Sequence, residues 1–151
     1  MIYEQIGFKG LDVKGITIHN TGNKLSAKEI YDYIETSGTN HGCHYLVDEK
    51  ETIQVLPLDY CTYHTGKGLD FGNTNTIAIE ICRSQSDIET YLKAQKRAIE
   101  LIKDLMSKYG LTNDQVFFHN SFNERTYCPH RILDIYKSRK EFIDKELWQL
   151  K

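Results

Sequence analysis

GITIHNTG, residues 15–22, is a short run of β-branched residues bounded by glycines. This pattern predicts a buried strand that ends at His19. The next segment, residues 26–38, begins with Ser26 and has Glu29 three positions later, which is a capping box ahead of apolar residues at helical spacing. A strand followed directly by a helix is the unit from which α/β folds are built.

The middle of the chain adds further strands. Residues 43–57 predict two strands around a charged turn at 48–50, and Pro57 closes the second strand. A loop rich in glycine, asparagine and threonine follows over residues 63–75. Residues 76–83, TIAIEICR, then predict a third apolar strand that carries a glutamate inside it.

The last third alternates helix, strand and helix. Residues 86–109 keep apolar side chains at helical spacing, and Gly110 ends that helix. Residues 115–120 predict a fourth main strand that ends at His119, and residues 137–150 predict an amphipathic helix. We therefore expect an α/β fold with a single domain, in which helices flank a central mixed, mostly parallel β-sheet.

Composition narrows the classes of function. With 151 residues, 40% hydrophobic and 26% charged, the chain has the size and balance of one ordinary globular domain. A net charge of −2 lacks the basic excess of most proteins that bind nucleic acid or anionic membranes. The sequence has no apolar run of membrane-spanning length and no secretory signal pattern, so we expect synthesis in a cytoplasm and no membrane insertion. The four cysteines form no CxxC pair, which predicts free thiols.

Two histidines and a cysteine form a candidate metal site. His19 and His119 each stand at the end of an apolar strand and each precede an asparagine, and Cys128 follows in the next loop. If the two strands are neighbours, the two imidazoles can converge, because functional groups in α/β sheets gather where strands end. Two imidazoles and a thiolate suit Zn²⁺ and leave its fourth position for a water molecule that can attack an amide. The alternative is two buried histidines and a core cysteine.

Glu80 is a candidate general base. Strand alternation puts it on the same face as Ala78 and Cys82. A carboxylate on such an apolar face needs a hydrogen-bonding or charged partner, or else has a functional role. Burial raises the pKa of such a carboxyl group towards neutrality, which suits a group that takes and returns a proton. The alternative is a glutamate on an edge strand that faces solvent.

Five motifs along the chain together resemble a known family. In order, they are ITIHNT (16–21), GCHYLVD (42–48), YHTGKG (63–68), NTNTIAIEI (73–81) and CPHRI (128–132). This ordered set is similar to the zinc-dependent N-acetylmuramoyl-L-alanine amidases of type 2, a family that includes phage endolysins and peptidoglycan recognition proteins. The resemblance runs from about residue 15 to about residue 133, which is most of the chain.

The resemblance implies a substrate, a reaction and a set of site residues. It implies hydrolysis of the amide between N-acetylmuramic acid and the L-alanine of the stem peptide in peptidoglycan, in a groove across the zinc. Matched position by position, the metal ligands are His19, His119 and Cys128, and the catalytic glutamate is Glu80. His64 in YHTGKG matches a substrate-binding histidine that lines the groove.

Two positions depart from the family pattern. Many members carry lysine two residues before the last ligand, where this chain has Thr126, whose hydroxyl can donate a hydrogen bond to the developing oxyanion as a second catalytic group. Arg125 beside it is a candidate to supply the missing positive charge to the substrate. Some members have a catalytic tyrosine where this chain has Cys43, which places Cys43 at the expected substrate-binding site.

The resemblance leaves a second function open. Parts of the family bind the stem peptide without cutting it, and such non-hydrolytic binding modules usually lack the cysteine ligand, which this chain has at Cys128. We expect residues 1–151 to form a single catalytic domain with no cell-wall-binding domain in this chain. A phage or prophage endolysin that acts on the bacterial cell wall during host lysis fits these expectations, with peptidoglycan as its partner and no nucleic acid.

Overall fold

The computed structural model of the chain describes residues 2–66 and 68–147. Its centre is a five-stranded sheet with the strand order β4-β3-β6-β2-β7. The strands are β2 (Gly15–Asn20), β3 (Tyr45–Val47), β4 (Thr52–Gln54), β6 (Thr76–Ile81) and β7 (Val116–Phe118). Three neighbouring pairs are parallel and only β3 and β4 run antiparallel. The predicted mixed, mostly parallel sheet is therefore confirmed.

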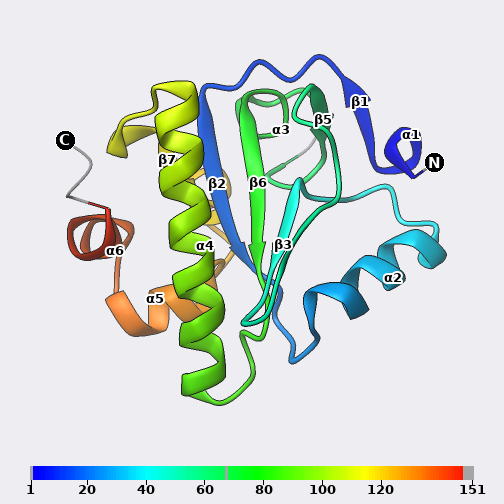
Figure 1. The fold of residues 1–151 in the computed structure, drawn as a ribbon. Coiled ribbons are helices and arrows are strands. Elements are labelled where there is room, and N and C mark those ends of the chain that lie inside the picture. Colours follow the sequence, from blue (N-terminus) through cyan, green and yellow to red (C-terminus); the bar gives the residue numbers. More distant parts are fainter. Residues whose placement is uncertain (1, 67, 148–151) are drawn as a thin grey trace.

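Helices cover both faces of this sheet (Figure 1). They are α1 (Tyr3–Ile6), α2 (Ala27–Ser37), α3 (Phe71–Asn75), α4 (Ile88–Tyr109), α5 (His130–Tyr136) and α6 (Arg139–Glu146). The long helix α4 crosses the front of the sheet, with α5 and α6 beside it at one edge and α2 at the opposite side of the molecule. Among the described residues, no helix combines the length and the apolar character needed to cross a membrane.

The predicted start of α2 and the predicted end of α4 are confirmed. The Ser26 side chain accepts a hydrogen bond from the backbone of Glu29, whose carboxylate accepts one from the backbone of Ser26, so the capping box is confirmed. Gly110 has a φ of 64° and ends α4 in the left-handed region, which glycine adopts without strain. The predicted start at residue 86 was two residues early, because Asp87 is the cap.

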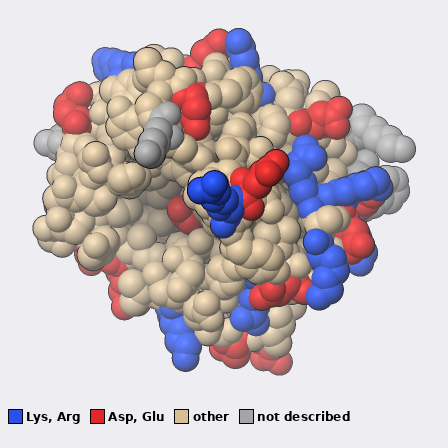
Figure 2. Space-filling view, turned by 180° about the vertical axis from the view of Figure 1, so that it is seen from behind, with Lys and Arg blue, Asp and Glu red and all other residues tan. Residues whose placement is uncertain are grey.

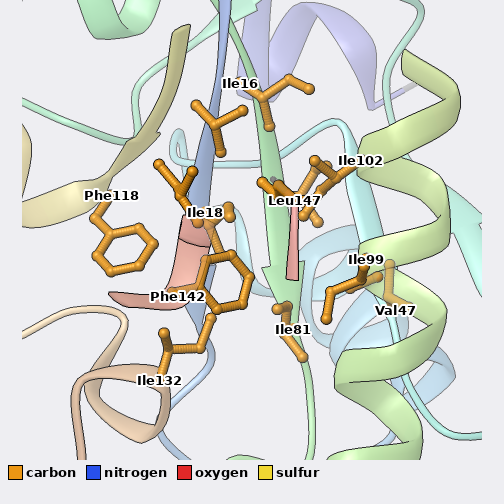
Figure 3. Close-up of a cluster of buried hydrophobic side chains, with 14 of the residues drawn as sticks. Ile16, Ile18, Val47, Ile81, Ile99, Ile102, Phe118, Ile132, Phe142 and Leu147 are labelled. Carbon is orange, nitrogen blue, oxygen red and sulfur yellow. The ribbon is translucent and has the colours of Figure 1, made fainter. Parts of the chain in front are cut away.

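Strand alternation divides the side chains of β2 between the two faces. Ile16 and Ile18 point towards α4, α5 and α6 and join the larger core (Figure 3). Thr17 and His19 point to the opposite face of the sheet. Because β2 and β6 pair in parallel, the side chains of Ala78, Glu80 and Cys82 lie on that same face. The front face therefore packs the larger core, whereas the back face carries both a second, smaller core and the side chains of His19 and Glu80.

Several short elements differ from the sequence-based predictions. The predicted loop 63–75 contains α3, whose five residues depend on the cap at Asp70 rather than on an apolar stripe. The strand β5 (Tyr60–Thr62) pairs with β1 (Gly7–Lys9) in a separate two-stranded sheet. The predicted strand 115–120 is shorter, because His119 begins a 3₁₀ turn, η2 (His119–Ser121).

The predicted carboxyl-terminal helix is confirmed in part, because Lys137 ends α5 and Ser138 caps α6, which begins only at Arg139. Within residues 137–150, α6 forms and buries Phe142 and Ile143. Residues 148–150 of that prediction lie outside the described residues. The preceding helix α5 was not predicted, because its seven residues are too few for a periodic pattern to stand out. A second 3₁₀ turn, η1 (Asn113–Gln115), leads into β7.

Candidate active site

The two predicted histidines meet at the carboxyl ends of neighbouring strands. Strands β2 and β7 pair in parallel with Ile18 opposite Phe118, so the next residues, His19 and His119, lie side by side. Their ring centroids are 4.7 Å apart. The sequence-based expectation that the two imidazoles converge is confirmed.

Cys128 reaches the same place from the loop ahead of α5. Its Sγ lies 3.8 Å from Nδ1 of His19, and the ligand atoms offered by His19, His119 and Cys128 all lie within 4.8 Å of one another. The backbone N–H of Asn120 donates to the carbonyl of Cys128 at 3.0 Å, which closes the loop between the second and third of these residues. The three side chains form a group that could hold a metal ion.

Asn20 fixes the start of α5 beside this group. Its side-chain oxygen accepts hydrogen bonds from the backbone N–H groups of Arg131 at 2.9 Å and Ile132 at 3.3 Å. Its side-chain nitrogen donates to the hydroxyl of Tyr91 at 3.2 Å. Since Asn20 follows His19 directly, one buried amide ties the first ligand strand to the helix that follows Cys128.

Burial favours the uncharged form of all three candidate ligands. Burial, followed by the neighbouring His64 and His119, holds the pKa of His19 well below its usual value, and burial also lowers the pKa of His119. Burial raises the pKa of the Cys128 thiol to about 12, with a smaller contribution from the carboxylate of Glu80. A neutral imidazole has a lone pair that can bind a metal ion. A buried thiolate at Cys128 needs the positive charge of a cation bound beside it. Two nitrogens and one sulfur suit a borderline-soft divalent ion with one open position.

Glu80 lies next to the ligand group on the same face of the sheet. It pairs in register with His19 across β2 and β6, and β6 is an internal strand of the sheet. One carboxylate oxygen, Oε1, is buried and has no hydrogen-bond partner among the described residues. Burial raises the pKa of this carboxyl group to about 8. The alternative of a solvent-facing glutamate on an edge strand is therefore wrong.

A groove opens from Glu80 towards α2 on the back face. It has a volume of about 470 Å³. Its lining residues are Asn20, Thr21, Asn23, Leu25, Ile30, Tyr33, Ile34, Thr39, His41, Gly42, Cys43, Leu46 and Glu80. None of the described residues that line the groove is a lysine or an arginine, and Glu80 is the only carboxylate among them. Figure 2 shows this back face with a hollow near its centre and with basic and acidic side chains beside the hollow.

The other predicted site residues differ in their burial and in their contacts with the candidate metal ligands. Cys43 lines the groove and is buried, and burial raises the pKa of its thiol well above the usual value. His64 lies against His19, with its Nδ1 3.0 Å from Nε2 of His19. Thr126 is half-buried and Arg125 is exposed in the loop before Cys128, and neither side chain forms a hydrogen bond within the described part of the chain. The four cysteines are free thiols, as predicted.

Sequence reasoning did not single out three asparagine and histidine side chains that hold this site together. They are Asn20, His44 and Asn73, all buried. Asn20 stands directly after a ligand histidine in HNT, which was a signal, because a polar residue at the end of a buried strand needs hydrogen-bond partners. His44 and Asn73 gave no such signal, since their partners come from distant or irregular segments.

Comparison with known proteins matches the chain to one family. The family described as N-acetylmuramoyl-L-alanine amidase matches residues 9–131. The amidase CwlA of Bacillus subtilis is 40% identical over 119 residues, which are 78% of this chain and 43% of that protein. The amidase XlyB of the same organism is 38% identical over 135 residues, 87% of this chain and 42% of that protein. The chain thus spans less than half the length of these curated relatives.

Solved structures match the fold of the chain. The structure of PlyL superimposes with a TM-score of 0.85 at 32% identity and covers 92% of this chain and 87% of that chain. The catalytic domain of PlyG gives a TM-score of 0.85 at 31% identity, over 95% of this chain and 88% of that one. Motifs, fold and site geometry agree with these matches, and the chain belongs to the N-acetylmuramoyl-L-alanine amidase family.

Proposed function

We propose that this chain is a zinc-dependent amidase domain that hydrolyses the amide bond between N-acetylmuramic acid and L-alanine in bacterial peptidoglycan. The observation that carries the proposal is the buried, unpartnered carboxylate oxygen of Glu80 beside three convergent metal-binding side chains. The names of the curated relatives, all N-acetylmuramoyl-L-alanine amidases or an endolysin, support this choice of bond.

The donor set favours zinc as the metal. His19, His119 and Cys128 supply two nitrogens and one sulfur, which suit zinc better than magnesium or calcium, whose preferred ligands are oxygens. Three protein ligands are typical of a catalytic zinc site, whereas structural sites have four. Zinc, when bound there, supplies a Lewis acid that polarises the scissile carbonyl and makes a water molecule acidic near neutral pH.

Glu80 moves the proton in this proposal. Its carboxylate accepts a proton from the attacking water and then delivers it to the alanine nitrogen as the amide bond breaks. Burial alone raises the pKa of Glu80 to about 8, and a divalent cation nearby lowers it towards neutrality. A carboxyl group with a pKa near the working pH can both accept and return the proton.

The remaining predicted residues form the outer part of the proposed site. We assign the hydroxyl of Thr126 to the developing oxyanion, and Arg125 to a carboxylate of the stem peptide. Cys43 lines the groove next to Glu80 as a neutral thiol and offers the substrate an uncharged surface. The presence of both Cys128 and Glu80 argues against the non-hydrolytic binding module. We further propose that the chain acts on the cell wall as the catalytic domain of a phage or prophage endolysin.

The test replaces Glu80 by glutamine, which keeps the shape of the side chain and removes its base. Purified cell walls are incubated with wild type, Glu80→Gln and the control Glu51→Gln, whose carboxylate is exposed and distant from the groove lining. We expect wild type and control to release new alanine amino groups without new reducing sugar ends, and Glu80→Gln to lose about 10²- to 10⁴-fold in rate. Its zinc content should equal that of wild type. Full activity of Glu80→Gln, or release of reducing ends instead of alanine, contradicts the proposal.

A further inference from the structure

His64 lies against the first candidate ligand, on the side of its ring away from Cys128. Nδ1 of His19 faces Cys128 Sγ at 3.8 Å, whereas Nε2 of His19 lies 3.0 Å from Nδ1 of His64. The two ring nitrogens of His19 therefore face different partners. Nδ1 is turned to the metal-binding group, and Nε2 is occupied by a second histidine.

This division determines where the protons lie. A nitrogen that binds a metal uses its lone pair, so His19 must carry its proton on Nε2. That N–H then donates to Nδ1 of His64, which must be unprotonated and leaves the proton of His64 on its own Nε2. Nε2 of His64 is buried and has no hydrogen-bond partner among the described residues.

The loop around His64 is built to hold its backbone in place. The side-chain oxygen of the fully buried Asn73 accepts hydrogen bonds from the backbone N–H groups of His64 at 2.8 Å and Thr65 at 3.0 Å. The side-chain nitrogen of Asn73 donates to the carbonyls of Gly66 and Gly68, both at 3.1 Å. One amide therefore organises the whole turn that presents the His64 ring to His19.

We propose that His64 is a positioning residue, which fixes the tautomer and the ring orientation of His19 for metal binding. Ligand histidines in metal sites usually donate their second N–H to a carboxylate, carbonyl or water, and an imidazole acceptor takes that place here. The inference rests on the metal centre of the proposed function. The sequence-based expectation that His64 lines the substrate groove stays a separate prediction.

Two substitutions at His64 separate this role from a packing role. His64→Leu keeps an apolar side chain of similar bulk but removes the acceptor. His64→Asn keeps an acceptor near the position of Nδ1. Zinc affinity is measured without substrate, by competition with a chromophoric chelator, and the absorption spectrum of the cobalt-loaded chain reports ligand geometry. Melting of the metal-free chains checks that each variant folds.

We expect His64→Leu to bind zinc about 10- to 100-fold more weakly than wild type and to change the cobalt spectrum. His64→Asn should recover most of the affinity. Lys93→Leu, at an exposed position of α4, is the control and should bind zinc as wild type does. Wild-type affinity in His64→Leu, or equally weak binding in His64→Asn and His64→Leu, overturns the positioning role alone. If His64→Leu fails to fold, wild-type affinity in His64→Asn supports the role and weak binding overturns it. A wild-type chain that takes up no zinc overturns the metal centre as well.

Discussion

His44 makes the stability of the fold depend on pH in a way that can be calculated. It is fully buried, and its Nε2–H donates to the carbonyl of Tyr60 at 2.6 Å while its Nδ1 accepts the backbone N–H of Ala78 at 2.9 Å. A proton on Nδ1 would face that N–H and break the contact. Burial accordingly lowers the pKa of His44 from 6.5 to about 4.

The sign and size of the effect follow from this difference. Between about pH 4 and pH 6.5 the unfolded chain binds a proton at His44 that the folded chain does not, so the free energy of unfolding falls as the pH falls through this window. At about 1.4 kcal/mol for each pH unit, the loss amounts to about 3 kcal/mol. Above pH 6.5 the contribution is constant, because His44 is neutral in both states.

Denaturant unfolding of the metal-free wild type and of His44→Gln, at pH 7.5 and at pH 4, measures this contribution. Glutamine cannot be protonated in this range, and the other titrating groups are common to both chains. We expect wild type to be the more stable chain at pH 7.5 and the difference to shrink by about 3 kcal/mol at pH 4. An equal difference at both pH values refutes the reasoning, because it means that His44 binds its proton equally in both states.

Two further substitutions test how the site is held together. Asn20→Ala removes the acceptor for two backbone N–H groups at the start of α5. We expect it to lower the free energy of unfolding by about 2–3 kcal/mol and to weaken zinc binding, both measured on the same preparation. Unchanged zinc affinity means that Asn20 does not position Cys128. Gly72→Ala places a Cβ 2.6 Å from Cβ of Thr65. We expect the free energy of unfolding, measured with denaturant, to fall by about 1–3 kcal/mol. A stability equal to wild type means that the backbone around Thr65 shifts without cost.

The sequence predicted those parts of the fold that local chemistry determines. The β-branched run at residues 15–20 and the capping box at Ser26 act through neighbours in the chain, so both could be read before the structure was known. The short elements α3 and α5 could not, because caps and tertiary contacts hold them and their apolar residues are too few for a period.

Some contacts of the candidate site could likewise be predicted from the sequence, and others could not. His19 and His119 stand at strand ends, and parallel pairing of the two strands is enough to bring them together. The contact between His64 and His19 was beyond sequence reasoning, since the two residues are 45 positions apart and meet through a loop that Asn73 organises. The side chain of His44, which pairs with the backbone of β6 at Ala78, is a further contact of that kind.

Metal analysis of the purified chain, combined with wall digestion, tests the central claim most directly. We expect one zinc ion per wild-type chain, little zinc in Cys128→Ser, and loss of alanine release after chelation that returns when zinc is added. Equal zinc in the two chains, or a metal-free preparation that cleaves peptidoglycan at the full rate, contradicts the assignment of His19, His119 and Cys128 as the catalytic metal site.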